Sequence, residues 1–115
     1  MQNAAAIYSS ELNQIVKTPI IPEECYSSWA QYTICTNSNE ERDALKVELK
    51  RNGIPTNIYY VLPLHKQKAL EDICVKYNVN NTTDICKRVL SLPFGPYISE
   101  KEIKYVCDKI KDFYC

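Results

Sequence analysis

The only histidine of the chain lies among side chains that could bind an anionic or polar ligand. His65 follows Pro63 and Leu64, with Tyr60 shortly before it and Gln67 shortly after it. An imidazole can donate a hydrogen bond or carry a positive charge near neutral pH, and both suit a carboxylate or a phosphate. His65, Gln67 and Tyr60 are therefore our candidate substrate-binding residues. The alternative is that His65 caps a helix or is exposed at a turn.

Local patterns predict that this histidine lies between a strand and a helix. Residues 56–61 are mainly β-branched or aromatic, which predicts a strand, and apolar residues at helical spacing predict a helix over residues 66–77. Side chains held between two rigid elements are well placed to face a ligand. Alternation along the strand would direct Tyr59 and Tyr60 to opposite faces of a sheet, one to the core and the other outward.

The remaining elements alternate along the chain. The patterns predict helices over residues 2–16, 38–52, 83–88 and 100–114, and strands over residues 28–35 and 89–92. Ser38 with Glu41 has the spacing of a capping box, and Gly53 predicts a Schellman-type helix end. Ser99 with Glu102 gives a second capping box. We expect an α+β fold with a small three-stranded, mostly antiparallel sheet and helices packed mainly on one face.

Composition excludes several classes of function. The 115 residues suffice for one domain with a single core, and 14 basic residues balance 14 acidic ones. A zero net charge does not favour nucleic acid or an anionic membrane. No apolar run approaches the ~20 residues that span a membrane, and the N-terminus lacks the features of a signal peptide. We expect a cytoplasmic protein that binds neither nucleic acid nor membrane.

Six cysteines are spread along the chain without a C-x-x-C pair. In a secreted domain they would form three disulfides, whereas a zinc site of ordinary spacing is not expected with a single histidine. Cys74, Cys86 and Cys107 fall on the apolar stripes of expected helices, where a thiol acts as a small hydrophobe. We expect reduced cysteines and no metal site, with a small secreted disulfide protein as the alternative.

Two stretches carry the motifs of a known family. The first contains Gly53-Ile54, Tyr60, Pro63-Leu64-His65 and Gln67, and the second contains Leu90-Ser91-Leu92-Pro93, Pro96, Ile98, Ser99 and Glu102. Nearly all of the chain thereby resembles the C-terminal region of the nucleotide-sugar aminotransferases that depend on pyridoxal phosphate (PLP), the DegT/DnrJ/EryC1/StrS family. The chain departs from that family at Val61, where a proline often follows the strand tyrosine.

The resemblance implies the small domain of a fold-type-I PLP enzyme, with residues 1–17 as an inter-domain-type helix and residues 18–115 as the small α+β domain. The parent enzyme would move an amino group from glutamate or a similar donor to a keto-sugar nucleotide, for polysaccharide or related biosynthesis. Its partners would be the large PLP-binding domain, the second protomer of a homodimer and the nucleotide-sugar substrate. His65 would face the cofactor cleft.

The groups that make PLP reactive are expected elsewhere. PLP needs a Schiff-base lysine, a carboxylate at its ring nitrogen and a cradle for its phosphate, and in the family these lie on the large domain. Here the lysines are expected on helix faces or in loops, and Arg42, Arg51 and Arg88 are expected to be surface charges. We therefore expect no catalytic residue and no cofactor held by this chain alone.

Two hypotheses of different classes remain. In the first, the chain is a domain or fragment of such an aminotransferase, inactive alone, and its first helix exposes apolar surface around Ile7 and Tyr8. In the second, it is a stand-alone α+β module that binds another protein or a nucleotide sugar. Under both hypotheses we expect Trp29 in the core. The alternative is that this strand tryptophan stacks on a base or a sugar.

Overall fold

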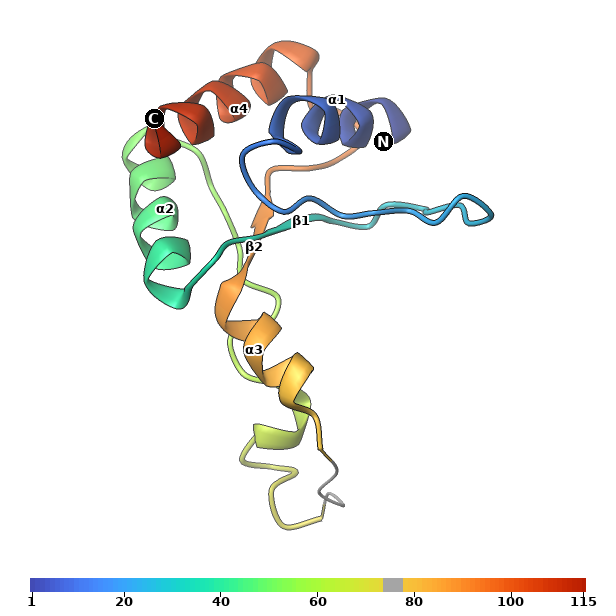
Figure 1. The fold of residues 1–115 in the computed structure, drawn as a ribbon, viewed down its shortest axis with the longest axis vertical. Coiled ribbons are helices and arrows are strands. Elements are labelled where there is room, and N and C mark those ends of the chain that lie inside the picture. The colour runs from blue at the N-terminus through green and yellow to red at the C-terminus, as the bar shows by residue number, and fades with distance from the viewer. Residues whose placement is uncertain (74–77) are drawn as a thin grey trace.

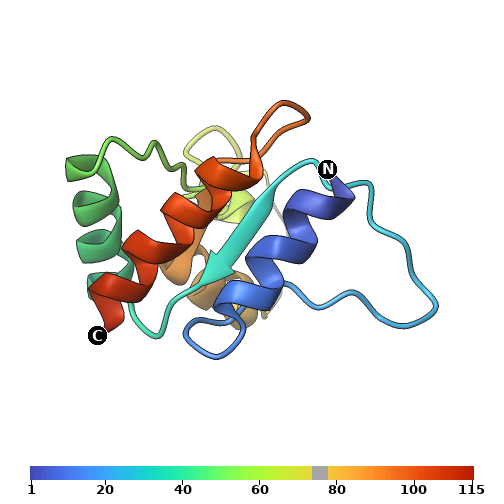
Figure 2. The ribbon, with the colours of Figure 1, turned by 90° about the horizontal axis from the view of Figure 1, so that it is seen from above.

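In the computed structural model, which describes residues 1–73 and 78–115, helices gather around a small antiparallel sheet (Figure 1). The order of elements is α1 (Gln2–Leu12), β1 (Tyr32–Cys35), α2 (Asn39–Arg51), the 3-10 helix η1 (Leu64–Lys66), α3 (Asn80–Arg88), β2 (Val89–Leu92) and α4 (Glu100–Tyr114). Helices α1 and α4 lie over one face of β1, and α3 lies on the other side (Figures 1 and 2). The predicted α+β class is confirmed.

The sheet has two strands in the described residues, whereas we predicted three. β1 and β2 pair antiparallel along their whole length. Residues 56–61 contribute only Asn57, whose backbone exchanges hydrogen bonds of 3.1 and 2.7 Å with Ser91. The pairing cannot extend in one direction because Pro55 and Pro93 lack an N–H, and in the other direction β2 gives way to α3.

Two predicted elements are shorter in the structure. β1 begins only at Tyr32 because Trp29, with φ of 52°, is left-handed and interrupts the extended run predicted over residues 28–35. The first helix ends at Leu12, and Lys17 already accepts a 2.9 Å backbone hydrogen bond from Cys35. The chain therefore leaves the helix early enough to line the sheet.

The helix predicted over residues 66–77 is wrong in its described part. The single turn η1 ends at Lys66, because Gln67 is extended with φ of −67° and ψ of 130°. No side chain of residues 68–73 is buried, and a helix in a protein gains most of its stability from packing an apolar face. Residues 74–77 lie outside the described residues.

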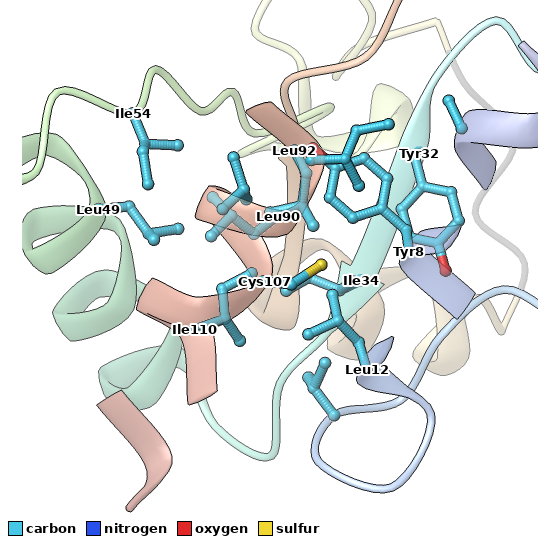
Figure 3. Close-up of a cluster of buried hydrophobic side chains, with 14 of the residues drawn as sticks. Tyr8, Leu12, Tyr32, Ile34, Leu49, Ile54, Leu90, Leu92, Cys107 and Ile110 are labelled. Atoms are coloured by element: carbon cyan, nitrogen blue, oxygen red, sulfur yellow. The ribbon is translucent and has the colours of Figure 1, made fainter. Parts of the chain in front are cut away.

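The core centres on stacked aromatic rings between α1 and the sheet (Figure 3). The ring of Tyr8 stacks on that of Tyr32 at 4.9 Å, and the Tyr8 hydroxyl donates a 2.7 Å hydrogen bond to the carbonyl of Pro93. Tyr8 is fully buried and burial raises its pKa, while Ile7 is half-buried against the same core. The apolar exposure that we expected around Ile7 and Tyr8 is therefore wrong.

The helix ends follow the sequence closely. Ser99 and Glu102 form the predicted reciprocal capping box of α4. Ser38 caps α2 by accepting a 3.1 Å hydrogen bond from the Glu41 N–H. Gly53, with φ of 74°, ends α2 in the predicted Schellman geometry, where its own N–H and that of Ile54 bond to carbonyls of the last turn.

The two glycines give a matched test of backbone strain. A methyl group added at either Gly53 or Gly95 meets no atom within 4 Å, but only Gly53 has a left-handed φ. Gly53→Ala should lower the free energy of unfolding by about 1–2 kcal/mol, while Gly95→Ala should change it by less than about 0.5 kcal/mol. Urea denaturation of the two variants measures the difference. Equal effects would contradict a strain specific to the end of α2.

The ion pair between Glu11 of α1 and Lys111 of α4 gives a prediction for pH. The hydrogen bond from Lys111 lowers the pKa of Glu11 in the folded protein. The ion pair therefore stabilises the fold fully above the ordinary glutamate pKa of about 4.3. This stabilisation is lost as the pH falls through the lower pKa of the folded protein. Glu11→Gln should lower Tm at neutral pH. The difference in Tm between this variant and the wild type, called the gap below, should disappear between about pH 4 and pH 2.

Thermal melts followed by circular dichroism across this pH range measure the gap. Glu48→Gln is the control, since it removes an exposed pair with Arg51 inside α2 and joins no two elements. A gap for Glu11→Gln that stays constant down to about pH 2 would contradict the role of the ion pair.

Candidate functional site

Residues 56–73 and 78–88 form an extension that we call the projection; it leaves the core below the sheet in Figure 1. Among its described side chains only Pro63 is buried. Its large exposed apolar residues are Tyr59, Tyr60, Val61, Leu62, Leu64, Ile73 and Ile85. Monomeric proteins seldom leave so many apolar side chains exposed in one segment, so the projection has the character of a contact surface.

His65 lies in η1, where a short turn holds it between exposed neighbours. Pro63 begins this turn by accepting a 2.9 Å hydrogen bond from the Lys66 N–H, and Leu64 accepts one of 3.0 Å from the Gln67 N–H. The imidazole is half-buried, and within residues 1–73 and 78–115 no group forms a hydrogen bond with it. It does not cap a helix. Its hydrogen-bonding groups can therefore serve a ligand.

The other two candidate residues share the projection with His65 but do not bond to it. Tyr60 is 67% exposed, and its ring packs edge-on against Tyr59 at 5.5 Å. The exposed Gln67 donates a 3.4 Å hydrogen bond to the carbonyl of Leu62. Neither tyrosine belongs to the core, because the strand that would have sent one of them inward does not form.

Charge near His65 is positive. Lys66 and Lys68 are exposed on either side of Gln67, and no carboxylate occurs from residue 58 to residue 70. These two ammonium groups are near His65 in the sequence and favour anions, and the carboxylates of Glu71 and Asp72 follow further along the chain. The segment therefore suits a phosphate or a carboxylate.

A hollow of about 310 Å³ lies where the projection leaves the sheet. Aromatic rings of Tyr59 and Phe94 line it together with the side-chain amides of Gln31 and Asn57, and the remaining lining residues are Ala30, Pro55, Ser91, Leu92 and Pro93. Rings with a few amides suit a sugar or a base. The sequence analysis missed Phe94, Gln31 and Asn57, which come from three separate segments of the chain.

PLP does not fit this hollow. The cofactor requires a lysine amine and a carboxylate on either side of its ring, and the hollow is lined by neither. We therefore assign no step of the cofactor's chemistry to the residues that line it. Their contribution is limited to shape, ring stacking and hydrogen bonds.

Other candidates from the sequence have structural roles. Trp29 is buried in the core, as we predicted, and its indole N–H donates a 3.1 Å hydrogen bond to Gln2. The five described cysteines are free thiols; Cys107 is buried, and burial raises its pKa to about 12. No cluster of metal-binding side chains occurs in residues 1–73 and 78–115. None of the described helices is long and apolar enough to cross a membrane.

Comparison with known proteins gives a consistent set of relatives. The profile of the DegT/DnrJ/EryC1/StrS aminotransferase family matches residues 1–111. The chain is 36% identical over 107 residues to the UDP-2-acetamido-2-deoxy-3-oxo-D-glucuronate aminotransferase of Pseudomonas aeruginosa, covering 92% of this chain and 28% of that protein. It is also 36% identical to the pleiotropic regulatory protein of Geobacillus stearothermophilus. That match covers 96% of this chain and 30% of that protein.

A solved structure matches the fold closely. The crystal structure of a DegT DnrJ EryC1 StrS aminotransferase from Brucella abortus is similar with a TM-score of 0.90 and 37% identity. The match covers 98% of this chain and 30% of that one. The chain thus spans less than a third of the length of these relatives.

The exposed apolar side chains of the projection should cause weak self-association of the 115-residue chain. Val61→Asn, at a position that is 67% exposed, should lower the average mass at concentrations near about 100 µM because it removes apolar contact area. Sedimentation equilibrium measures the mass. Val47→Asn makes the same change at a 51% exposed position on α2 and should have no effect. Equal effects at both positions would contradict a contact surface on the projection.

Proposed function

Because the chain belongs to the DegT/DnrJ/EryC1/StrS aminotransferase family, we propose that it is the C-terminal, small-domain part of a PLP-dependent nucleotide-sugar aminotransferase and is not catalytic alone. The observation that carries the proposal is the close match of 98% of this chain to 30% of the Brucella aminotransferase. In this assignment residues 1–17 contain the helix that joins the domains, and residues 18–115 form the small α+β domain.

The complete enzyme would transfer an amino group from a glutamate-like donor to a keto-sugar nucleotide. PLP, bound by the rest of the enzyme, would supply the electron sink for that reaction. The named activity of the Pseudomonas relative, on UDP-2-acetamido-2-deoxy-3-oxo-D-glucuronate, supports a nucleotide-sugar substrate. In polysaccharide biosynthesis such a reaction produces amino sugars.

The projection would supply part of the substrate site. His65 would bind a substrate phosphate or the carboxylate of the amino donor, with Lys66 and Lys68 attracting the anion. Gln67 and Tyr60 would add an amide and a hydroxyl. The hollow beside Tyr59 and Phe94 would accept an uncharged part of the substrate.

The partners of this chain would be the large PLP-binding domain and a second protomer. Tyr60, Val61 and Leu64 are exposed within five consecutive positions, 60–64. Burying such residues against another surface is favourable by about 25 cal/mol per Å². A stand-alone binding module is less favoured, because nearly the whole chain matches less than a third of the aminotransferase relatives.

A chimaeric enzyme tests the proposal. The matching 28% of the Pseudomonas aminotransferase is replaced by this chain, and the amination of its keto-sugar nucleotide is measured. The chimaera should be active, and His65→Ala should lower kcat/KM by about tenfold or more, because a hydrogen bond to a charged group is lost. His65→Gln should recover part of that loss if a hydrogen bond suffices. Lys109→Ala, on α4 outside the projection, is the control.

Three results would count against the proposal. A chimaera that folds and binds PLP but gives no product would exclude the assigned role in the enzyme. Saturable binding of a nucleotide sugar to the isolated chain by calorimetry, lost in His65→Ala, would instead favour the stand-alone module. Stoichiometric labelling of one lysine by PLP and borohydride would place a cofactor site on this chain itself.

A further inference from the structure

Helix α3 is attached to the core without apolar packing. It contains no buried residue, whereas α1, α2 and α4 each bury several side chains. Ile85, the largest apolar residue of α3, is exposed. Since packing of an apolar face provides most of a helix's stability in a protein, other contacts must hold α3 in place.

One of these contacts comes from Arg42 of α2. We predicted a surface charge at this position, but Arg42 is only 5% exposed. Its Nη1 donates a 3.2 Å hydrogen bond to the carbonyl of Cys86, in the last turn of α3. The last carbonyls of a helix lack partners within it and carry partial negative charge, so a guanidinium is a favourable partner there.

Neighbouring residues of α2 fix the direction of this guanidinium. Nε of Arg42 donates a 2.7 Å hydrogen bond to Asp43, and Nη2 donates one of 2.7 Å to the side chain of Asn39. Two of its bonds therefore stay within α2 and a third crosses to α3. Breaking the crossing bond leaves the other two intact.

The junction of α3 with β2 is held separately. The N–H and the hydroxyl of Thr36 donate hydrogen bonds of 2.9 and 3.0 Å to the carbonyl of Arg88, and Nη1 of Arg88 donates one of 3.0 Å to the carbonyl of Thr36. These contacts lie at the last residue of α3. The bond from Arg42 reaches Cys86, further along the helix from the junction.

We propose that Arg42 is a latch: when its bond to the carbonyl of Cys86 breaks, α3 swings away from α2 about the Thr36–Arg88 junction while the core stays folded. The other end of the projection remains paired through Asn57 and Ser91. The latch does not depend on the proposed function, and its test uses no substrate.

Native-state hydrogen exchange of the 115-residue chain tests the latch without any substitution. Once detached, α3 has nine residues and no packed face and cannot stay helical in water, so at low urea its amides should exchange through an opening that exposes little surface and depends weakly on urea. Amides of α4 should exchange only through global unfolding, with a steep dependence. If the exchange rates of α3 and α4 depend equally steeply on urea, α3 opens only when the core unfolds. That result would exclude the latch.

Variants then assign the opening to Arg42. Arg42→Met keeps the apolar stem but loses the hydrogen bond, and it should speed exchange in α3 by about tenfold to a hundredfold while α1 and α4 change by less than about twofold. Arg42→Lys, which keeps the charge without the planar fork, should give an intermediate increase. Arg51→Met, on an exposed part of the same helix, is the control and should leave α3 unchanged.

Unchanged exchange in α3 of Arg42→Met, or equal acceleration in all helices, would overturn the assignment. If Arg42→Met does not fold, the latch is tested by the exchange of α3 in Arg42→Lys and by the urea dependence of exchange in the wild type. Either of these alone can exclude the latch.

Discussion

The buried side chain of Tyr8 is the contact on which the arrangement of the core depends. Its ring stacks on Tyr32 of β1, and its hydroxyl bonds to the carbonyl of Pro93 just after β2. Burying a ring of this size stabilises by roughly 2–3 kcal/mol, and an unpaired buried hydroxyl would cost about 1–3 kcal/mol. One residue of α1 thus positions both strands, together with the turn that leads through Phe94 to α4.

This core divides the chain into two chemically different parts. Every residue of the apolar core cluster comes from before residue 55 or after residue 88. The projection between them packs the partly buried Ile58 against this cluster and is otherwise held mainly by hydrogen bonds from Ser91, Thr36 and Arg42. Apolar packing therefore makes the base rigid, whereas the part that contains His65 is attached by contacts that can break singly.

The sequence predicted the elements whose ends are coded locally or whose apolar face meets the core. The capping box at Ser99 and the left-handed Gly53 need only their neighbours, and the stripe of α4 packs as its spacing required. The predictions over residues 56–61 and 66–73 failed because the same residue types find no partner there. β-branched residues make a strand only beside another strand that can accept the pairing, and here two prolines prevent it.

The candidate site could be predicted only in part, for a related reason. A histidine two residues after Pro63 and close to two lysines can be recognised from its neighbours, and it lies half-buried in η1 on the projection. The hollow beside Phe94 joins three segments distant in the sequence, so no local pattern contains it. Arg42 looked like a surface charge because its partner, the carbonyl of Cys86, is a backbone atom that no sequence pattern identifies.

Under the proposed function, binding of substrate and docking of the domain would be linked. His65 is only half-buried, and the hollow of about 310 Å³ is at the lower end of the roughly 300–1,000 Å³ that ligand sites occupy. A ligand bound here would need a second protein surface to enclose it. The apolar residues next to His65 can pack against such a surface and exclude water from the imidazole. Exclusion of water strengthens the attraction between the imidazole and an anion. The same contact would therefore attach the domain and strengthen its binding of substrate.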